Sequence, residues 1–205
     1  TITDVREALN VSAYYNCLGK PMPLSASNIE HDLGQDELII KEDSGRYSIT
    51  NLGALLLAKR LSLFGHLSRK SVRVIQHKGT SRLQMLKDET FDEGYAVCFD
   101  KIEQYLKALL PSEEIIGDDG IRRTASKFPM LAIREAAANM CIHQDMTIKG
   151  SSLLIEIFDD RIEFTNPGSL LVELMRIIDN PPRSRNEKLA ALMRRFNICE
   201  EAGTG

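Results

Sequence analysis

The chain has 205 residues, of which 43% are hydrophobic and 27% are charged. This is enough apolar material to bury a core without disulfides or metals, so we expect one sizeable domain, or one domain with a small appendage. Its 26 Lys and Arg residues against 29 Asp and Glu residues give a formal net charge of −3. That balance excludes a chain whose overall field attracts polyphosphates, so any contact with nucleic acid must be local.

The cysteines give no sign of a disulfide framework or a zinc ribbon, because they stand singly with no C-x-x-C pair. They are Cys17, Cys98, Cys141 and Cys199. We expect reduced thiols and a cytoplasmic protein. No apolar run reaches the roughly 18 residues that cross a bilayer, so no membrane is expected. The sequence begins at Thr1 and stops at Gly205 within a glycine-rich stretch, and we interpret it as a piece of a longer protein.

Residues 1–60 are predicted to form a small unit of their own. A helical segment begins near Ser27, and "LIIKE" and "RYSIT" flank the turn signal Asp43-Ser44-Gly45. A second helix follows with Thr50 as its cap. The order helix, hairpin, helix is compatible with a winged-helix-like module. It is equally compatible with a hairpin that only packs this unit onto the main domain, and both interpretations stay open.

Residues 61–205 are predicted to mix helices and strands. "SVRVIQHKG" alternates like a strand, and "DEGYAVCFDKIEQYLKALLP" has helical spacing up to Pro111. "EEIIGDDGIRRTASKF" indicates a polar connection with room for a short strand, and Pro129 then begins a helix. Strands at 152–158 and 161–165, a tight turn at Asp159 and Asp160, and a helix at 187–196 complete the prediction.

The helix that Pro129 begins carries the most informative stretch, "AIREAAANMCIHQD". Glu135, Asn139 and His143 fall at i, i+4 and i+8, which places all three on one stripe. A carboxylate and an amide oxygen one turn apart could hold Mg²⁺ directly or through water. Glu135 could instead act as general base while Asn139 holds the metal. The alternative is that these polar residues form only the solvent-exposed face of an amphipathic helix, while Ile133, Ala137 and Met140 face the core.

A local basic patch lies between residues 176 and 195. Six basic side chains against two acidic ones give it a net charge of +4, and such a patch can meet the phosphates of a nucleotide or of DNA. The basic residues are Arg176, Arg183, Arg185, Lys188, Arg194 and Arg195, and the acidic ones are Asp179 and Glu187. Arg183 and Arg185, in a loop with two prolines, are the better phosphate candidates. The alternative is a solvated arginine face on a packed helix.

Three separated stretches resemble one known family. "PMLAIREAAANMCIHQD", "GSSLLIEIFDDRIEFTNPGSL" and "PRSRNEKLAALMRRFNICEEAGTG" are similar to the RecG-helicase-related C-terminal domain of bacterial and archaeal transcriptional regulators. There it usually follows an AlbA/Schlafen-type domain. The family is itself similar to the GHKL (HATPase-like) ATPases, which implies an α+β fold: a GHKL-like α/β sandwich with a mixed sheet covered by helices. The chain has no G-x-x-x-x-G-K-[ST] loop, so no helicase motor is expected.

The resemblance implies roles for two residues of the stripe. Asn139 would bind Mg²⁺ on ATP, and Glu135 would activate the attacking water. The closing "GTG", with Gly203 and Gly205, resembles the glycine-rich lid whose backbone N–H groups cradle phosphate.

One part of the GHKL pattern is missing. The family's aspartate-x-glycine-x-glycine box corresponds here to "TNPGS", where Thr165 or Asn166 replaces the aspartate that recognises adenine. Asn166 could still hydrogen-bond a base, although an amide is not the fixed acceptor that a carboxylate supplies. Gly168 would either contact the ligand or only shape a tight turn with Pro167.

Two functions therefore stay open. One is a module that binds ATP and Mg²⁺, as a weak ATPase or as a switch, inside a DNA-associated transcriptional regulator. The sequence feature that favours this function is the pair Glu135 and Asn139. The other is a degenerate, non-hydrolysing scaffold for homodimerisation or DNA docking. The sequence feature that favours it is the absence of the adenine-recognising aspartate at "TNPGS". DNA would be contacted through the full-length protein in either case.

Overall fold

The computed structural model describes residues 1–110, 112–116, 122–126, 128–169 and 184–199. Its helices are α1 (Ile2–Ala8), α2 (Val11–Cys17), α3 (Ala26–Gln35), α4 (Asn51–Leu57), α5 (Tyr95–Leu109), α6 (Met130–His143) and α7 (Glu187–Arg195). Its strands are β1 (Ile39–Lys41), β2 (Tyr47–Ile49), β3 (Val72–His77), β4 (Met85–Phe91), β5 (Ser112–Ile116), β6 (Arg122–Ser126), β7 (Leu153–Ile157) and β8 (Ile162–Thr165). Two short 3₁₀ turns, Leu61–Leu63 and Gly65–Leu67, follow α4.

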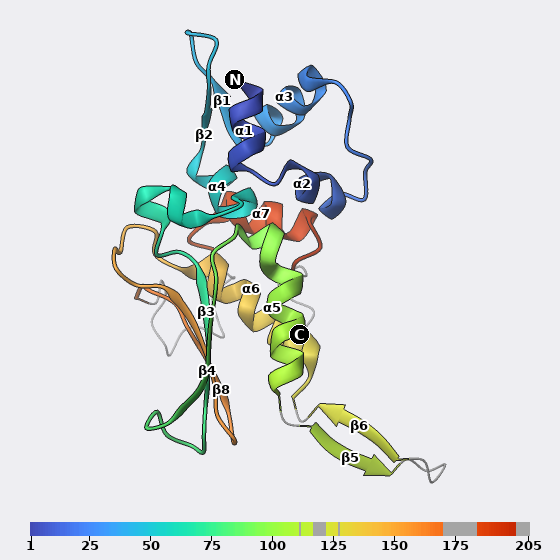
Figure 1. The fold of residues 1–205 in the computed structure, drawn as a ribbon, viewed down its shortest axis with the longest axis vertical. Coiled ribbons are helices and arrows are strands. Elements are labelled where there is room, and N and C mark those ends of the chain that lie inside the picture. Colours follow the sequence, from blue (N-terminus) through green and yellow to red (C-terminus); the bar gives the residue numbers. More distant parts are fainter. Residues whose placement is uncertain (111, 117–121, 127, 170–183, 200–205) are drawn as a thin grey trace.

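The largest sheet has the order β4-β3-β7-β8. Strands β3 and β7 are parallel, whereas β4 and β8 run antiparallel to their neighbours. Helices α5 and α6 lie on one side of this sheet, and the N-terminal helices lie at one end (Figure 1). A mixed sheet with helices on one face is consistent with a GHKL-like α/β sandwich, so the predicted fold class is confirmed.

The small β1–β2 hairpin lies beside α1 and α3, and its turn extends past them (Figure 1). The Oγ1 atom of Thr50 accepts a hydrogen bond of 2.9 Å from the backbone N–H of Gly53, so the predicted cap of α4 is confirmed. Buried residues form one continuous cluster that includes both the α1–α4 region and the sheet. The boundary near residue 60 stays a prediction, because the core does not break there.

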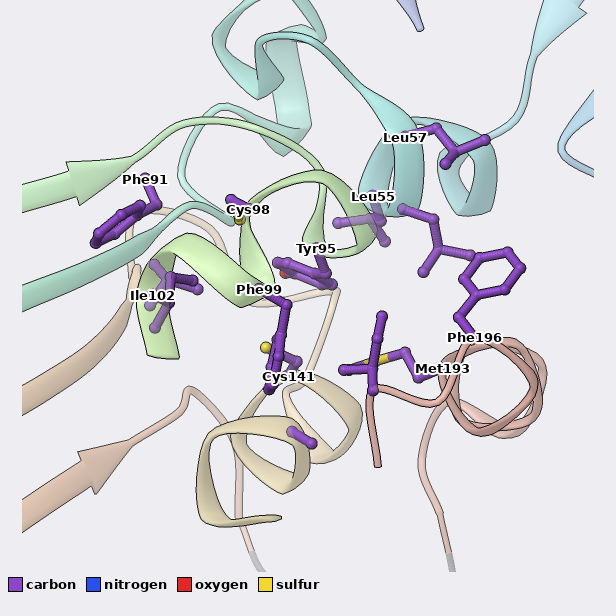
Figure 2. Packing of buried hydrophobic residues seen from close by; sticks show 14 of the residues in the cluster. Leu55, Leu57, Phe91, Tyr95, Cys98, Phe99, Ile102, Cys141, Met193 and Phe196 are labelled. Carbon is purple, nitrogen blue, oxygen red and sulfur yellow. The ribbon is translucent and has the colours of Figure 1, made fainter. Parts of the chain in front are cut away.

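The centre of this cluster lies where α4, α5, α6 and α7 meet (Figure 2). Tyr95 and Phe99 of α5 pack near Cys141 of α6, with Met193 and Phe196 on the α7 side. The apolar faces predicted for the two later helices are buried as expected. They comprise Ile133, Ala137 and Met140 on α6, and Leu189, Leu192 and Met193 on α7.

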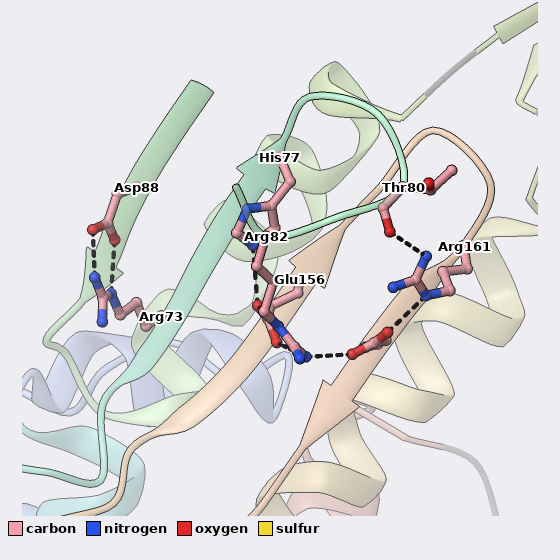
Figure 3. A network of polar contacts seen from close by, with 8 residues as sticks. Arg73, His77, Thr80, Arg82, Asp88, Glu156 and Arg161 are labelled. Carbon is pink, nitrogen blue, oxygen red and sulfur yellow. Dashed lines mark hydrogen bonds and ion pairs between the residues drawn. The ribbon is translucent and has the colours of Figure 1, made fainter. Parts of the chain in front are cut away.

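A polar network crosses the sheet and ties the loop after β3 to β7 and β8 (Figure 3). Arg82 donates to both carboxylate oxygens of Glu156, at 2.8 and 2.7 Å, and also to Glu163 at 2.6 Å. His77 lies 3.0 Å from Glu156 and stacks on Phe158, with ring centroids 4.8 Å apart. The Arg82 guanidinium lowers the pKa of Glu156. These contacts join groups from three segments, so they fix the loop against the sheet.

Two segments differ from the sequence prediction. The expected polar connection before α6 contains two antiparallel paired strands, β5 and β6, which project away from the other elements (Figure 1). Strand β4 was not predicted at all, because six of its seven residues are exposed and it lacks the alternation of a half-buried strand. Main-chain pairing with β3 makes it a strand regardless of its side chains.

Gly94 stands where α5 begins against the backbone of α4. A Cβ atom built there would lie 2.5 Å from main-chain atoms of Leu56 and Leu57, which cannot move aside as a side chain can. We expect Gly94→Ala to lower the free energy of unfolding by about 1–3 kcal/mol. Gly34→Ala is the matched control, because it lies in α3 with open space around it. It should raise stability by about 0.5 kcal/mol. Chemical denaturation of both variants checks this, and equal stabilities would contradict it.

The buried thiols predict a loss of stability at alkaline pH. Burial raises the pKa of Cys98 from 9.0 to about 12, so the folded state keeps a proton that the unfolded chain loses above pH 9. The free energy of unfolding should therefore fall as pH rises through 9, by at most about 1.4 kcal/mol per pH unit for this thiol. Urea denaturation between pH 7 and 10 should show a shallower fall for Cys98→Ala than for the wild type. Parallel curves would contradict the assignment.

Candidate functional site

Helix α6 carries the predicted stripe on the side opposite its buried face. Pro129, which the sequence predicts to begin this helix, is its N-cap, and the helix starts one residue later at Met130. Glu135 is half-buried, whereas Asn139 and His143 are exposed. The three side chains therefore differ in surroundings although they share one stripe. The pKa of His143 is lowered because nearby protein atoms shield the ring from water and because the Arg185 cation lies near it.

Glu135 lines a hollow of about 620 Å³ between α6 and the end of α7. The described residues that line it are Leu131, Arg134, Glu135, Arg194, Arg195, Asn197 and Cys199. Three guanidinium groups and one carboxylate line this Glu135 hollow, and two of the guanidinium groups are already paired, Arg134 with Glu103 and Arg195 with Asp36. Asn139, one turn further along α6, lies beyond that lining. The hollow thus joins one predicted site residue to basic residues that the sequence had placed on α7.

Arg134 fixes the wall of the Glu135 hollow. Its guanidinium donates to the carbonyl oxygens of Asn197 (2.7 Å) and Ile198 (3.2 Å) and also pairs with Glu103. Asn197 has a φ of 55°, in the left-handed region that asparagine tolerates. This turn ends α7, so Arg134 joins the end of α7 to α6.

Cys199 lies in the hollow but is not activated. Burial raises the pKa of its thiol, and the Glu135 carboxylate raises it further. Since the thiolate is the reactive form of cysteine, a raised pKa argues against a nucleophile here.

The other end of α6 is held by the "TNPGS" segment and by Arg185. The backbone N–H of Asp145 donates to the carbonyl of Pro167 at 2.7 Å. Gly168 has a φ of 133°, and a Cβ atom there would lie 3.1 Å from that of Asp145. Arg185 pairs with Asp145 and donates to the carbonyl of Ser169 at 2.6 Å. The turn of "TNPGS" is therefore packed against the end of the helix.

Two residues that the sequence analysis missed complete this end of α6. Lys70, only 2% exposed, donates through Nζ to the carbonyl oxygens of Asp145 (3.1 Å) and Ile148 (3.0 Å). Burial lowers the pKa of Lys70. Asn186, the N-cap of α7, donates to the carbonyls of Ile142 (2.7 Å) and Gln144 (2.9 Å). No sequence pattern marks Lys70, because a lysine before a strand ordinarily stays in water.

The structure gives Arg185 an internal partner, so a phosphate would have to displace Asp145 to bind it. Asn166 is half-buried and lies next to the turn at Pro167. Five residues of the predicted sites or of the patch between residues 176 and 195 lie outside the described residues: Arg176, Asp179, Arg183, Gly203 and Gly205.

The residues present suit a magnesium nucleotide better than a protein-enclosed metal. Among the described residues, no group of three or more His, Cys, Asp or Glu side chains could hold a metal ion. Glu135 and Asn139 offer two oxygen donors at most. Mg²⁺ that is bound to phosphates typically takes only one or two ligands from the protein and keeps waters.

Comparison with known proteins locates the likeness in the C-terminal part. Residues 150–205 match the family described as "Putative ATP-dependent DNA helicase recG C-terminal". This part of the chain is similar to that family. The resemblance predicted from the sequence is thereby confirmed for these residues, and α6, with Glu135 and Asn139, lies before them. No curated protein matches the chain.

A solved structure shares the fold. The DIP2311 protein from Corynebacterium diphtheriae superposes with a TM-score of 0.72 at 15% sequence identity. The match covers 96% of this chain and 38% of that protein, so the chain spans well under half of its length. At this identity the likeness shows the fold alone. Among the described helices, none is both long enough and apolar enough to cross a membrane.

The bonds from Asn186 to the end of α6 can be tested by a graded pair of substitutions. Asn186→Ala leaves two carbonyl oxygens without their donor and should lower the free energy of unfolding by about 1–3 kcal/mol. Asn186→Asp should lower it further at neutral pH, because a carboxylate cannot donate and would face those same oxygens. Thermal and urea denaturation check the order wild type, Ala, Asp. A stable Asp variant would show that these bonds contribute little.

Proposed function

We propose that this chain binds ATP with Mg²⁺ against α6 and uses the nucleotide as a switch, or hydrolyses it slowly, within a DNA-associated transcriptional regulator. The observation that carries the proposal is the placement of Glu135 in a hollow lined by arginines, with Asn139 exposed one turn away. The RecG-related, ATPase-like segment that follows α6 supports it.

Each residue of the proposed site has a chemical reason for its role. The amide oxygen of Asn139 is a hard ligand of the kind Mg²⁺ accepts. The Glu135 carboxylate can orient a water and accept its proton. Arg194 and Arg195 supply the positive charge that a polyphosphate needs. When bound, the metal would neutralise phosphate charge.

The link to DNA rests on the resemblance to transcriptional regulators and on the N-terminal unit. The described order of this unit, three helices followed by the β1–β2 hairpin and α4, supports the winged-helix-like interpretation. The net charge of −3 argues that contacts with DNA would be local or made by other parts of a longer cytoplasmic protein.

A second function is favoured by the other end of α6. Arg185 is held by Asp145 and Ser169, and Asn166 stands where the family has its adenine-binding aspartate. Both features suit a scaffold that keeps the fold for homodimerisation or DNA docking without turning over nucleotide. The two functions differ in whether nucleotide binds at all.

Calorimetric titration of ATP with Mg²⁺ distinguishes them. We expect the wild type to bind and Asn139→Ala to lose at least about tenfold in affinity, because one metal ligand is removed. Glu135→Gln should keep its affinity and lose hydrolysis, since the amide cannot accept a proton.

Asn28→Ala is the control, because it makes the same change at an exposed position of α3. No binding by the wild type would contradict the nucleotide site and favour the scaffold. Binding that Asn139→Ala leaves intact would place the nucleotide elsewhere.

A further inference from the structure

Arg195 stands between the Glu135 hollow and the N-terminal unit. Its guanidinium lines the hollow and also pairs with both carboxylate oxygens of Asp36, at 2.9 Å from Nη1 to Oδ1 and closer from Nη2 to Oδ2. Asp36 directly follows α3, 159 residues before Arg195. One side chain therefore contacts both the α3 end of the N-terminal unit and the candidate site.

Asp36 is held firmly in this pair. Its side chain is only 12% exposed, and the hydroxyl of Tyr14 donates to its Oδ2 atom at 2.6 Å. The ring of Tyr14 meets that of Phe196 edge to face, with centroids 5.8 Å apart. Arg195 itself is 46% exposed, so the guanidinium is the partner that can move toward the hollow.

A neighbouring pair provides an internal comparison. Glu37 pairs with Lys188 at the other end of α7, and both side chains are mostly exposed, at 62% and 67%. Lys188 lines a separate hollow on the α4 side rather than the Glu135 hollow. Glu37 thus has the same charge as Asp36 and also joins the N-terminal unit to α7, but it has no connection to the candidate site.

We propose that an anion of the phosphate class in the Glu135 hollow competes with Asp36 for Arg195, so that filling the hollow loosens the contact between α3 and α7. The choice of phosphate as the anion rests on the proposed function. The competition itself rests on the contacts of Arg195.

The chemistry of the guanidinium supports this competition. Arg195 has five N–H donors in a fixed planar fork, and its carboxylate-facing edge is used by the two bonds to Asp36. Phosphate and carboxylate compete for this same bidentate edge. Linkage between the two contacts is reciprocal. The free energy by which the Asp36–Arg195 pair weakens anion binding therefore equals the free energy by which the bound anion weakens that pair.

The experiment measures the affinity of magnesium pyrophosphate and of magnesium ATP for the wild type, Asp36→Asn and Glu37→Gln by calorimetry. Asp36→Asn frees Arg195 and should tighten binding about fivefold or more, the usual lower range of such coupling. Glu37→Gln makes the same change in net charge and should leave affinity within about twofold, since exposed pairs contribute little. Unchanged affinity in Asp36→Asn, or equal tightening in both variants, overturns the proposal.

Hydrogen exchange of the wild type gives a readout that does not depend on a variant's folding. Saturating pyrophosphate should speed exchange of the amides at the end of α3, including Asp36, because the anion withdraws Arg195 from that segment. Unchanged or slower exchange there overturns the proposal.

Asn139→Ala separates this inference from the proposed function. Binding that Asn139→Ala leaves intact and Asp36→Asn tightens supports the competition while contradicting the magnesium site at Asn139. ATP binding that Asn139→Ala abolishes and Asp36→Asn leaves unchanged supports the site and contradicts the competition. If no variant binds either anion, both fail.

Discussion

Helix α6 ends in main-chain carbonyl groups that have no partner within the helix, and side chains from elsewhere in the chain supply their donors. Asn186, on the N-terminal side of α7, reaches Ile142 and Gln144, and Lys70, just before β3, reaches Asp145. A buried carbonyl without a donor costs about 1–3 kcal/mol, so these bonds are a strong constraint. They fix where α7, the start of β3 and the turn after β8 lie relative to α6.

The site at the other end of α6 depends on this arrangement. Glu135 faces a hollow only because α7 is held alongside α6, and Arg134 then joins α6 to the turn that ends α7. An arginine-rich helix that would otherwise be a solvated face thus becomes the basic wall of a cavity. The same placement brings Arg195 within reach of Asp36, so the N-terminal unit and the hollow share one residue.

Most basic residues of the predicted patch that the structure describes are paired within the fold and do not form a free basic surface. A net charge of +4 suggested a free surface for phosphate or DNA, yet Arg185, Lys188 and Arg195 each pair with an internal carboxylate. Arg194 lines the hollow with no ion pair among the described residues. A ligand would meet a surface whose charges are already partly balanced, so its binding would rearrange internal pairs rather than only add new ones.

Much of the local structure follows from the sequence because its causes are local. Pro129 stands at the N-cap of α6, the 3.6-residue period buries Ile133 and Met140, and Thr50 caps α4, each through residues within one or two turns. The stripe of Glu135 and Asn139 also follows from spacing alone. The partners of Arg185, Arg195 and Lys70 do not, because they lie 40, 159 and 75 residues away. Any of 26 cations could have met any of 29 carboxylates, and only the packing of α6, α7 and the N-terminal unit decided which ones did.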